Sequence, residues 1–117
     1  MTGIPKVMLG GSALDNLADK SPSEWLADAI DTYQERGYQW GDPRDNFLRI
    51  YEISKRLGVQ LRDPADVAVV FIAAKWSRLM ESPASEDSYI DAIAYTAILA
   101  QLRNTDWGNF VVDTEHE

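Results

Sequence analysis

Residues 63–103 read "DPADVAVVFIAAKWSRLMESPASEDSYIDAIAYTAILAQLR" and predict a helical hairpin. The tetrad "DPAD" at 63–66 has a residue that can cap a helix, then proline, which suits the first helical position, and an acid that favours the helix dipole. The tetrad "SPAS" at 82–85 has a similar form. The apolar run between them is too long for a buried strand, which seldom exceeds about eight residues. We therefore expect antiparallel helices over residues 64–81 and 86–103, joined by a short turn.

The same start signal occurs twice upstream, as "SPSE" at 21–24 and "DPRD" at 42–45. It predicts one helix over about 22–36, ending at Gly37, and another over about 43–57, ending at Gly58 in a left-handed cap. The expected fold class is an all-α four-helix bundle formed by residues 21–104. A loose N-terminal arm (1–20), with a possible short helical turn after Ser12, would precede it. A short C-terminal tail (105–117) would follow and pack through Trp107 and Phe110 on the bundle or on a second subunit.

Each predicted helix has an apolar set that should face the core. The sets are Trp25, Leu26, Ala29, Ile30 and Tyr33 in the first helix, and Phe47, Ile50, Tyr51, Ile53 and Leu57 in the second. The third helix is apolar on all sides around "VAVVFIAAKW", so we expect it to be the central helix or part of a subunit interface.

Composition excludes several function classes. The 117 residues contain no cysteine and one histidine, His116, so thiol chemistry and a His-based zinc site are excluded. A formal net charge of −8 disfavours nucleic acid, although a small phosphorylated ligand needs only two or three local cations. No apolar run approaches the roughly 20 residues that span a bilayer, so we expect a cytoplasmic protein without membrane contact.

Asp91 lies in a run that is apolar on nearly every side, where a buried carboxylate needs a partner. Counting outward from the turn near Pro83 places Lys75 at the height of Asp91, and Arg78 near the height of Asp87. Two cations would then face two acids across the hairpin. These groups either form structural ion pairs, or Asp87 and Asp91 bind a divalent metal while Lys75 and Arg78 contact phosphate.

The stretch "ERGYQWGDPRDNF" at 35–47 has two aromatic residues between glycines, ahead of a helix start. Tyr38 and Trp40 offer a stacking surface for a base, and Asn46 offers an amide that can read a base edge. The alternative interpretation is an ordinary turn between helices with its aromatic side chains in the core.

Three motifs together, "WGDPRDNF", "ADVAVVFIAAKWSR" and "DSYIDAIAY", resemble a small phage and prophage domain of uncharacterised function. The resemblance covers roughly residues 35–102, and its pattern positions here include Asn46, Lys75, Arg78, Asp87, Asp91 and Tyr95, with Trp40 in place of the usual tyrosine. That domain is in turn distantly similar to the MazG-like and dimeric dUTPase-like all-α nucleoside triphosphate pyrophosphohydrolases. Those are helical dimers or tetramers that use E-x-x-E and E-x-x-D pairs to bind Mg²⁺ and release pyrophosphate. The resemblance implies that Asp87 and Asp91 form the second pair, whereas no E-x-x-E occurs on the second helix.

We therefore expect a phage-type nucleotide-binding protein, present as a homodimer in the cytoplasm of a bacterial host. It would be a Mg²⁺-dependent pyrophosphohydrolase, a non-catalytic binder that sequesters a signalling nucleotide, or an adaptor that contacts a host protein through Trp107 and Phe110.

Overall fold

The computed structural model describes residues 17–112, except the side chain of Tyr38, and these residues form four long helices and no strand. The helices are α3 (Pro22–Trp40), α4 (Pro43–Arg56), α5 (Pro64–Glu81) and α6 (Glu86–Arg103). The expected all-α bundle is confirmed. Most of the proposed N-terminal arm (1–16), including the turn after Ser12, and the end of the tail with His116 (113–117) lie outside the described residues.

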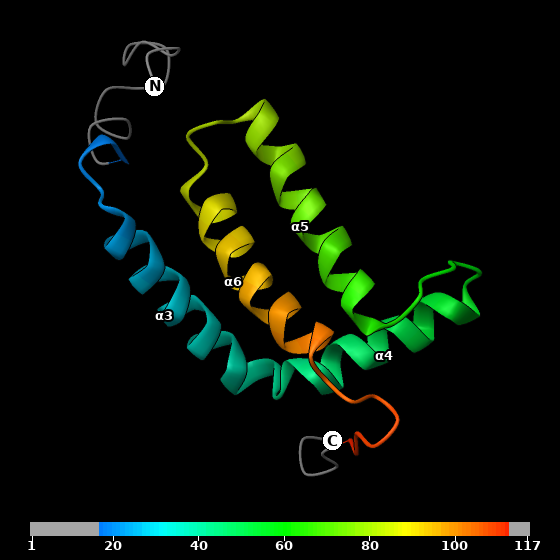
Figure 1. Cartoon of the computed structure of the whole chain (residues 1–117). Helices are drawn as coiled ribbons and strands as arrows, with labels where there is room; N and C mark the ends of the chain where they lie inside the picture. The colour runs from blue at the N-terminus through cyan, green and yellow to red at the C-terminus, as the bar shows by residue number, and fades with distance from the viewer. Residues whose placement is uncertain (1–16, 113–117) are drawn as a thin grey trace.

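Three helices lie side by side in one layer, with α6 between α3 and α5, while α4 crosses the lower end of the layer (Figure 1). The central helix is therefore α6, and α5 lies at an edge. The buried core is at the crossing with α4, around Phe47, Ala65, Val67, Ala68 and Leu102. No helix in the described part of the chain is long and apolar enough to span a membrane.

Three of the four predicted helix starts have the expected capping bonds. Ser21 and Glu24 form a reciprocal capping box, and the carboxylates of Asp42 and Asp63 accept backbone N–H groups of their own helices. The fourth differs: Ser82 ends α5, and α6 begins after Ser85, whose hydroxyl lies 2.8 Å from that of Ser88 instead of capping the backbone.

The helix ends show one correction. α4 ends as expected, because Gly58 takes a positive φ of 90° and the Val59 N–H donates to the Ser54 carbonyl at 2.9 Å. α3 does not end at Gly37 but continues to Trp40. Glycine inside a helix costs only about 1 kcal/mol, and the positive φ that ends the helix is supplied by Gly41, at 74°.

The apolar sets of the first two helices are only partly buried. Ala29 and Phe47 are buried as expected, whereas Leu26, Ile30, Ile53 and Leu57 are exposed. A single layer of three helices explains the difference, because each helix has fewer neighbours than it would have in a closed bundle.

The described part of the tail packs on the bundle of its own chain. Trp107 contacts the core and donates its indole N–H to the Leu102 carbonyl at 3.2 Å. Phe110 packs edge-on against Trp107, and the Arg44 guanidinium lies 5.1 Å from the Phe110 ring centre. These two rings are therefore engaged within the chain.

A charged cluster joins the start of α5 to the end of α6. Asp66 accepts hydrogen bonds from the Arg62 guanidinium at 2.9 and 3.0 Å, from the Arg62 backbone N–H at 2.9 Å and from Arg103 at 3.1 Å. Arg103 also reaches Asp63 at 3.4 Å. The hydrogen bonds from Arg62, with help from Arg103, hold the pKa of Asp66 well below its usual range.

Candidate functional site

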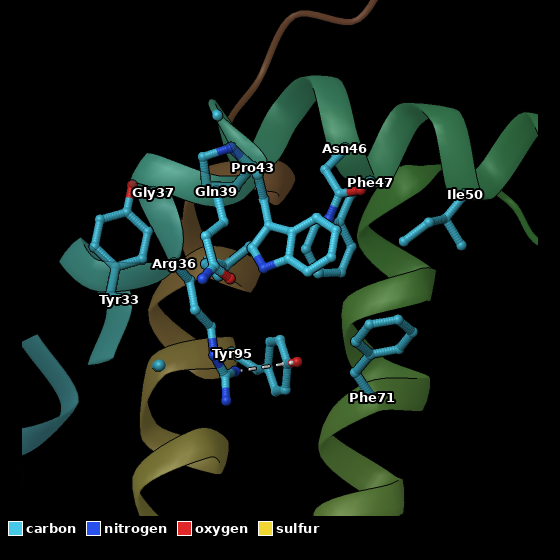
Figure 2. Close-up of a pocket in the computed structure, with 14 residues that line it drawn as sticks. Tyr33, Arg36, Gly37, Gln39, Pro43, Asn46, Phe47, Ile50, Phe71 and Tyr95 are labelled. Atoms are coloured by element: carbon cyan, nitrogen blue, oxygen red, sulfur yellow. Dashed lines mark hydrogen bonds between the residues drawn. The ribbon is translucent and has the colours of Figure 1, made fainter. Parts of the chain in front are cut away.

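An open pocket of about 520 Å³ lies where the α3–α4 corner faces α5 and α6. Its volume is within the range of sites for small molecules. Figure 2 shows lining residues from all four helices, among them Tyr33 and Arg36 of α3, Asn46 of α4, Phe71 of α5 and Tyr95 of α6. Gly41 and Pro43 form the corner, where the positive φ of Gly41 allows only two residues between the end of α3 and the start of α4.

Aromatic rings form the inner wall of the pocket. Phe71 packs against Phe47 and Tyr95 with both ring-centre distances at 5.3 Å, and the Phe71–Tyr95 contact is edge to face. Phe47 is buried, so this wall is fixed by the core. Trp40 also lines the pocket, and its side chain is largely exposed, at 61%. The pocket thus combines a rigid aromatic wall with an exposed indole that is able to stack on a planar ligand.

Asp91 is buried and accepts from two cations. The Lys75 ammonium lies 2.9 Å from Oδ2, and the Arg36 guanidinium lies 3.0 Å from Oδ1. The expected pairing across the α5–α6 hairpin is therefore present, and α3 supplies the second cation. In the described part of the chain, no buried side-chain nitrogen or oxygen lacks a hydrogen-bond partner.

Arg36 connects this ion cluster to the pocket. It lines the pocket, is 42% exposed, and places Nη1 3.5 Å from the Tyr95 hydroxyl (Figure 2). Lys75 does not line the pocket and is only 17% exposed. Two cations around one carboxylate leave one net positive charge beside the pocket, in a chain whose net charge is −8.

Amide groups extend the polar part of the pocket. Asn46 and Gln39 both line it, as expected for Asn46 if it reads a base edge. The start of α4 is less suited to an anion, because the Asp42 carboxylate accepts the Arg44 backbone N–H at 2.9 Å and pairs with the Arg44 guanidinium at 2.7 Å.

The expected second ion pair is not formed. Arg78 and Asp87 are both exposed, and within residues 17–112 neither forms a salt bridge. The counting argument fixed only the height of each side chain along the hairpin, not the direction in which it points, and both Arg78 and Asp87 are exposed to water. The cation beside the pocket is Arg36, not Arg78.

Asp87 and Asp91, the acids expected to bind Mg²⁺, are not gathered with a third possible ligand in the described part of the chain. The two oxygens of Asp91 are engaged by Arg36 and Lys75, and Asp87 is exposed. Among residues 17–112, no three His, Asp or Glu side chains gather closely enough to hold a metal ion. Proteins usually bind Mg²⁺ through one or two carboxylates together with waters and substrate phosphates, and both oxygens of Asp91 are already paired with cations.

Of the residues expected to recognise a base, Trp40 and Asn46 lie together at the pocket. The side chain of Tyr38 lies outside the described part of the structure. Gln39, Phe71 and Arg36 line the same pocket and were not expected there.

Residues 25–103 match the family model described as Domain of unknown function (DUF6378). The chain belongs to the DUF6378 family. The DUF6378 match contains every pocket-lining residue and the Arg36–Asp91–Lys75 cluster, so the site lies within the family domain and not in the tail. No curated protein and no solved structure matches the chain. The DUF6378 description names no activity, so the phage origin and the likeness to MazG-like enzymes stay expectations.

Proposed function

We propose that the pocket binds a nucleotide or a similar small molecule that has a planar ring and a phosphate, and that it does so without a protein-held metal. The observation that carries the proposal is the position of Arg36. A buried carboxylate fixes this guanidinium in the wall of an aromatic pocket, beside a second cation.

The pocket offers a partner for each part of such a ligand. The indole of Trp40 would stack on the ring, which is worth about 1–3 kcal/mol per base in other proteins. The amides of Asn46 and Gln39 would hydrogen-bond the ring edge, and Arg36 would donate to phosphate oxygens.

Binding would redistribute the hydrogen bonds of Arg36 without leaving Asp91 unpaired. Lys75 remains on Oδ2 when the guanidinium turns part of its donors toward the ligand. In this proposal Lys75 is a positioning residue that supplies charge from behind the pocket, and not the phosphate contact that the sequence suggested.

The test is calorimetric titration of the full chain with a panel of nucleoside mono-, di- and triphosphates and cyclic dinucleotides, with EDTA and then with Mg²⁺. We expect at least one ligand to bind in EDTA. Arg36→Met should weaken that ligand roughly 10- to 100-fold, because charge-assisted hydrogen bonds are worth about 1.5–3 kcal/mol. Arg49→Met, at an exposed arginine outside the pocket, is the matched control and should bind normally.

A second pair of variants tests the stacking role. Trp40→Leu should weaken binding, and Trp40→Tyr, which keeps a flat ring, should restore most of it. Release of pyrophosphate in the Mg²⁺ arm would overturn the metal-free part of the proposal and favour the pyrophosphohydrolase. Absence of binding to every ligand in both arms would overturn the proposal as a whole.

A further inference from the structure

A group of exposed apolar residues lies on one side of the α5–α6 pair. We call it the back face and define it by Val69, Ala73, Trp76 and Met80 of α5 with Ala97 and Ala100 of α6, all of which are exposed. The exposed fractions of Trp76 and Met80 are 56% and 84%. From Ala92 to Leu102, α6 carries no charged residue at all.

The back face points away from the pocket. At about 100° per residue, the four α5 positions lie roughly 140–180° around the helix from Phe71, which lines the pocket. The two α6 positions lie roughly 140–160° from Tyr95, which also lines it. The back face therefore has no part in ligand binding and needs a separate explanation.

Its dimensions are those of a protein interface. Both helices have 18 residues, a length of about 27 Å, and packed helices lie about 8–10 Å apart. Each copy would thus cover roughly 500 Å², and two copies would bury roughly 1,000 Å², the lower limit for a specific interface. The radius of gyration is 16.9 Å, against about 13 Å for a compact domain of about 100 residues. The single layer is thus less compact than a closed domain.

The order of residues on α5 suits a second copy of the same helix. Positions 69, 73, 76 and 80 follow the alternating spacing of four and three that forms a seam between packed helices. In an antiparallel two-fold pair, Trp76 would face the small Ala73 of the other copy, and Met80 would face Val69. Large residues would meet small or flexible ones twice, as an isologous interface requires.

We infer that the back face binds the back face of a second copy of this chain, with the two α5 helices antiparallel. The inference is independent of the proposed ligand, because the pocket lies on the other side of the layer. Sedimentation velocity of the full chain should show a species with twice the mass of one chain at micromolar concentration. Trp76→Glu should raise its dissociation constant by at least about 30-fold, as expected for a central interface residue replaced by a charge.

Leu57→Glu is the matched control, since Leu57 is 78% exposed and lies at the end of α4. It should sediment like the unchanged chain and keep its unfolding midpoint. Both variants should keep their circular dichroism spectra, whereas Trp76→Glu should unfold at a lower midpoint because it loses the stabilisation that dimer formation gives. Ala97→Arg places a charge on the α6 part of the back face. It tests the same interface without changing α5.

Cross-linking tests the geometry, because the natural chain has no cysteine. Ala73→Cys should form covalent dimers with a short bismaleimide, and Leu57→Cys should not. A chain that sediments as a monomer at every concentration, a dimer that survives both Trp76→Glu and Ala97→Arg, or a dimer in which Ala73→Cys does not cross-link would each overturn the inference.

Discussion

Asp91 and Asp66 each form ion pairs with two cationic side chains, but their surroundings differ. The Asp91 side chain is 8% exposed and lies between α3, α5 and α6, with Lys75 almost covered. The Asp66 side chain, at the end of the layer, is 14% exposed, and its partners Arg62 and Arg103 are 80% and 38% exposed. The Asp66 cluster is also balanced by Asp63, whereas the Asp91 cluster has two cations for one acid.

The difference shows why similar ion pairs do not have similar roles. A cluster with equal numbers of acids and cations fixes two chain segments but has no excess charge with which to attract a further anion. An unbalanced cluster whose outer cation lines an aromatic pocket is able to attract one. The following experiments test how far this contrast holds.

The largest effect is expected for Asp91→Asn, which leaves Arg36 and Lys75 without their acid. Breaking a buried ion pair costs about 3–5 kcal/mol, and we expect a loss near the lower value because Arg36 is able to turn toward water. Asp66→Asn should cost about 1 kcal/mol, since exposed pairs contribute little. Urea unfolding at one fixed protein concentration measures both. Equal losses at the two sites would contradict the contrast.

The next effect is the coupling between Arg36 and Lys75. Either cation alone is able to pair with Asp91, but Arg36→Met combined with Lys75→Met leaves a buried carboxylate unpaired. We expect the double variant to lose about 1–3 kcal/mol more than the sum of the single losses. The matched cycle of Arg62→Met and Arg103→Met at Asp66 should be additive within about 0.5 kcal/mol. If the losses from Arg36→Met and Lys75→Met were additive, the two cations would not be substituting for each other in compensating the buried carboxylate of Asp91.

Added salt should change the free energy of unfolding differently for variants in the two clusters, and this difference should be smaller than the coupling energy above. Arg103→Met is expected to cost up to about 1 kcal/mol at low salt, and the loss should shrink at about 0.5 M NaCl, because exposed ion pairs are screened. The loss from Lys75→Met should change much less, since the pair with Asp91 is buried. Parallel urea titrations at two salt concentrations provide the measurement. If the loss from Lys75→Met also shrank at high salt, the Lys75–Asp91 pair would be in contact with solvent.

The smallest effect is the contribution of Asp66 to acid stability. Its pKa is lowered in the folded chain by Arg62 and Arg103, so its ionised form stabilises the fold. That stabilisation is fully present above the unfolded pKa of about 3.9 and is lost as the pH falls further toward the lower folded value. The unfolding midpoint of the natural chain should therefore decrease more steeply than that of Asp66→Asn between about pH 4 and pH 2. Parallel slopes for the two proteins would contradict this assignment.

The helices and the hairpin were predictable because the signals for them are local. Capping residues, the prolines that follow them and the glycines beyond the ends act within one helical turn. The pairing of Lys75 with Asp91 followed from counting outward along one short turn. The error at Gly37 has the same local origin, since a glycine inside a helix and a glycine that ends one look alike until the next residues are placed.

Arg36 shows where this reasoning stops. It is 55 residues from Asp91 in sequence, on a helix that no short turn joins to α6. Without a known position for α3, its height and direction could not be counted, and a basic residue near a predicted helix end has an ordinary explanation in the helix dipole. The exposure of Leu26 and Ile30 could not be foreseen for the same reason.

The amino-acid sequence by itself determined that the chain is helical, where the helices start, and that α5 and α6 form a hairpin with Lys75 opposite Asp91. Only the tertiary structure decided that α6, not α5, is central, that Arg36 joins the cluster, and that the pocket and the back face lie on opposite sides of one layer. The physical reason is the separation in sequence of the residues that interact. Hydrogen bonds within a helix and across a short turn depend on neighbours in sequence, whereas the packing of distant helices depends on which apolar surfaces they bury together.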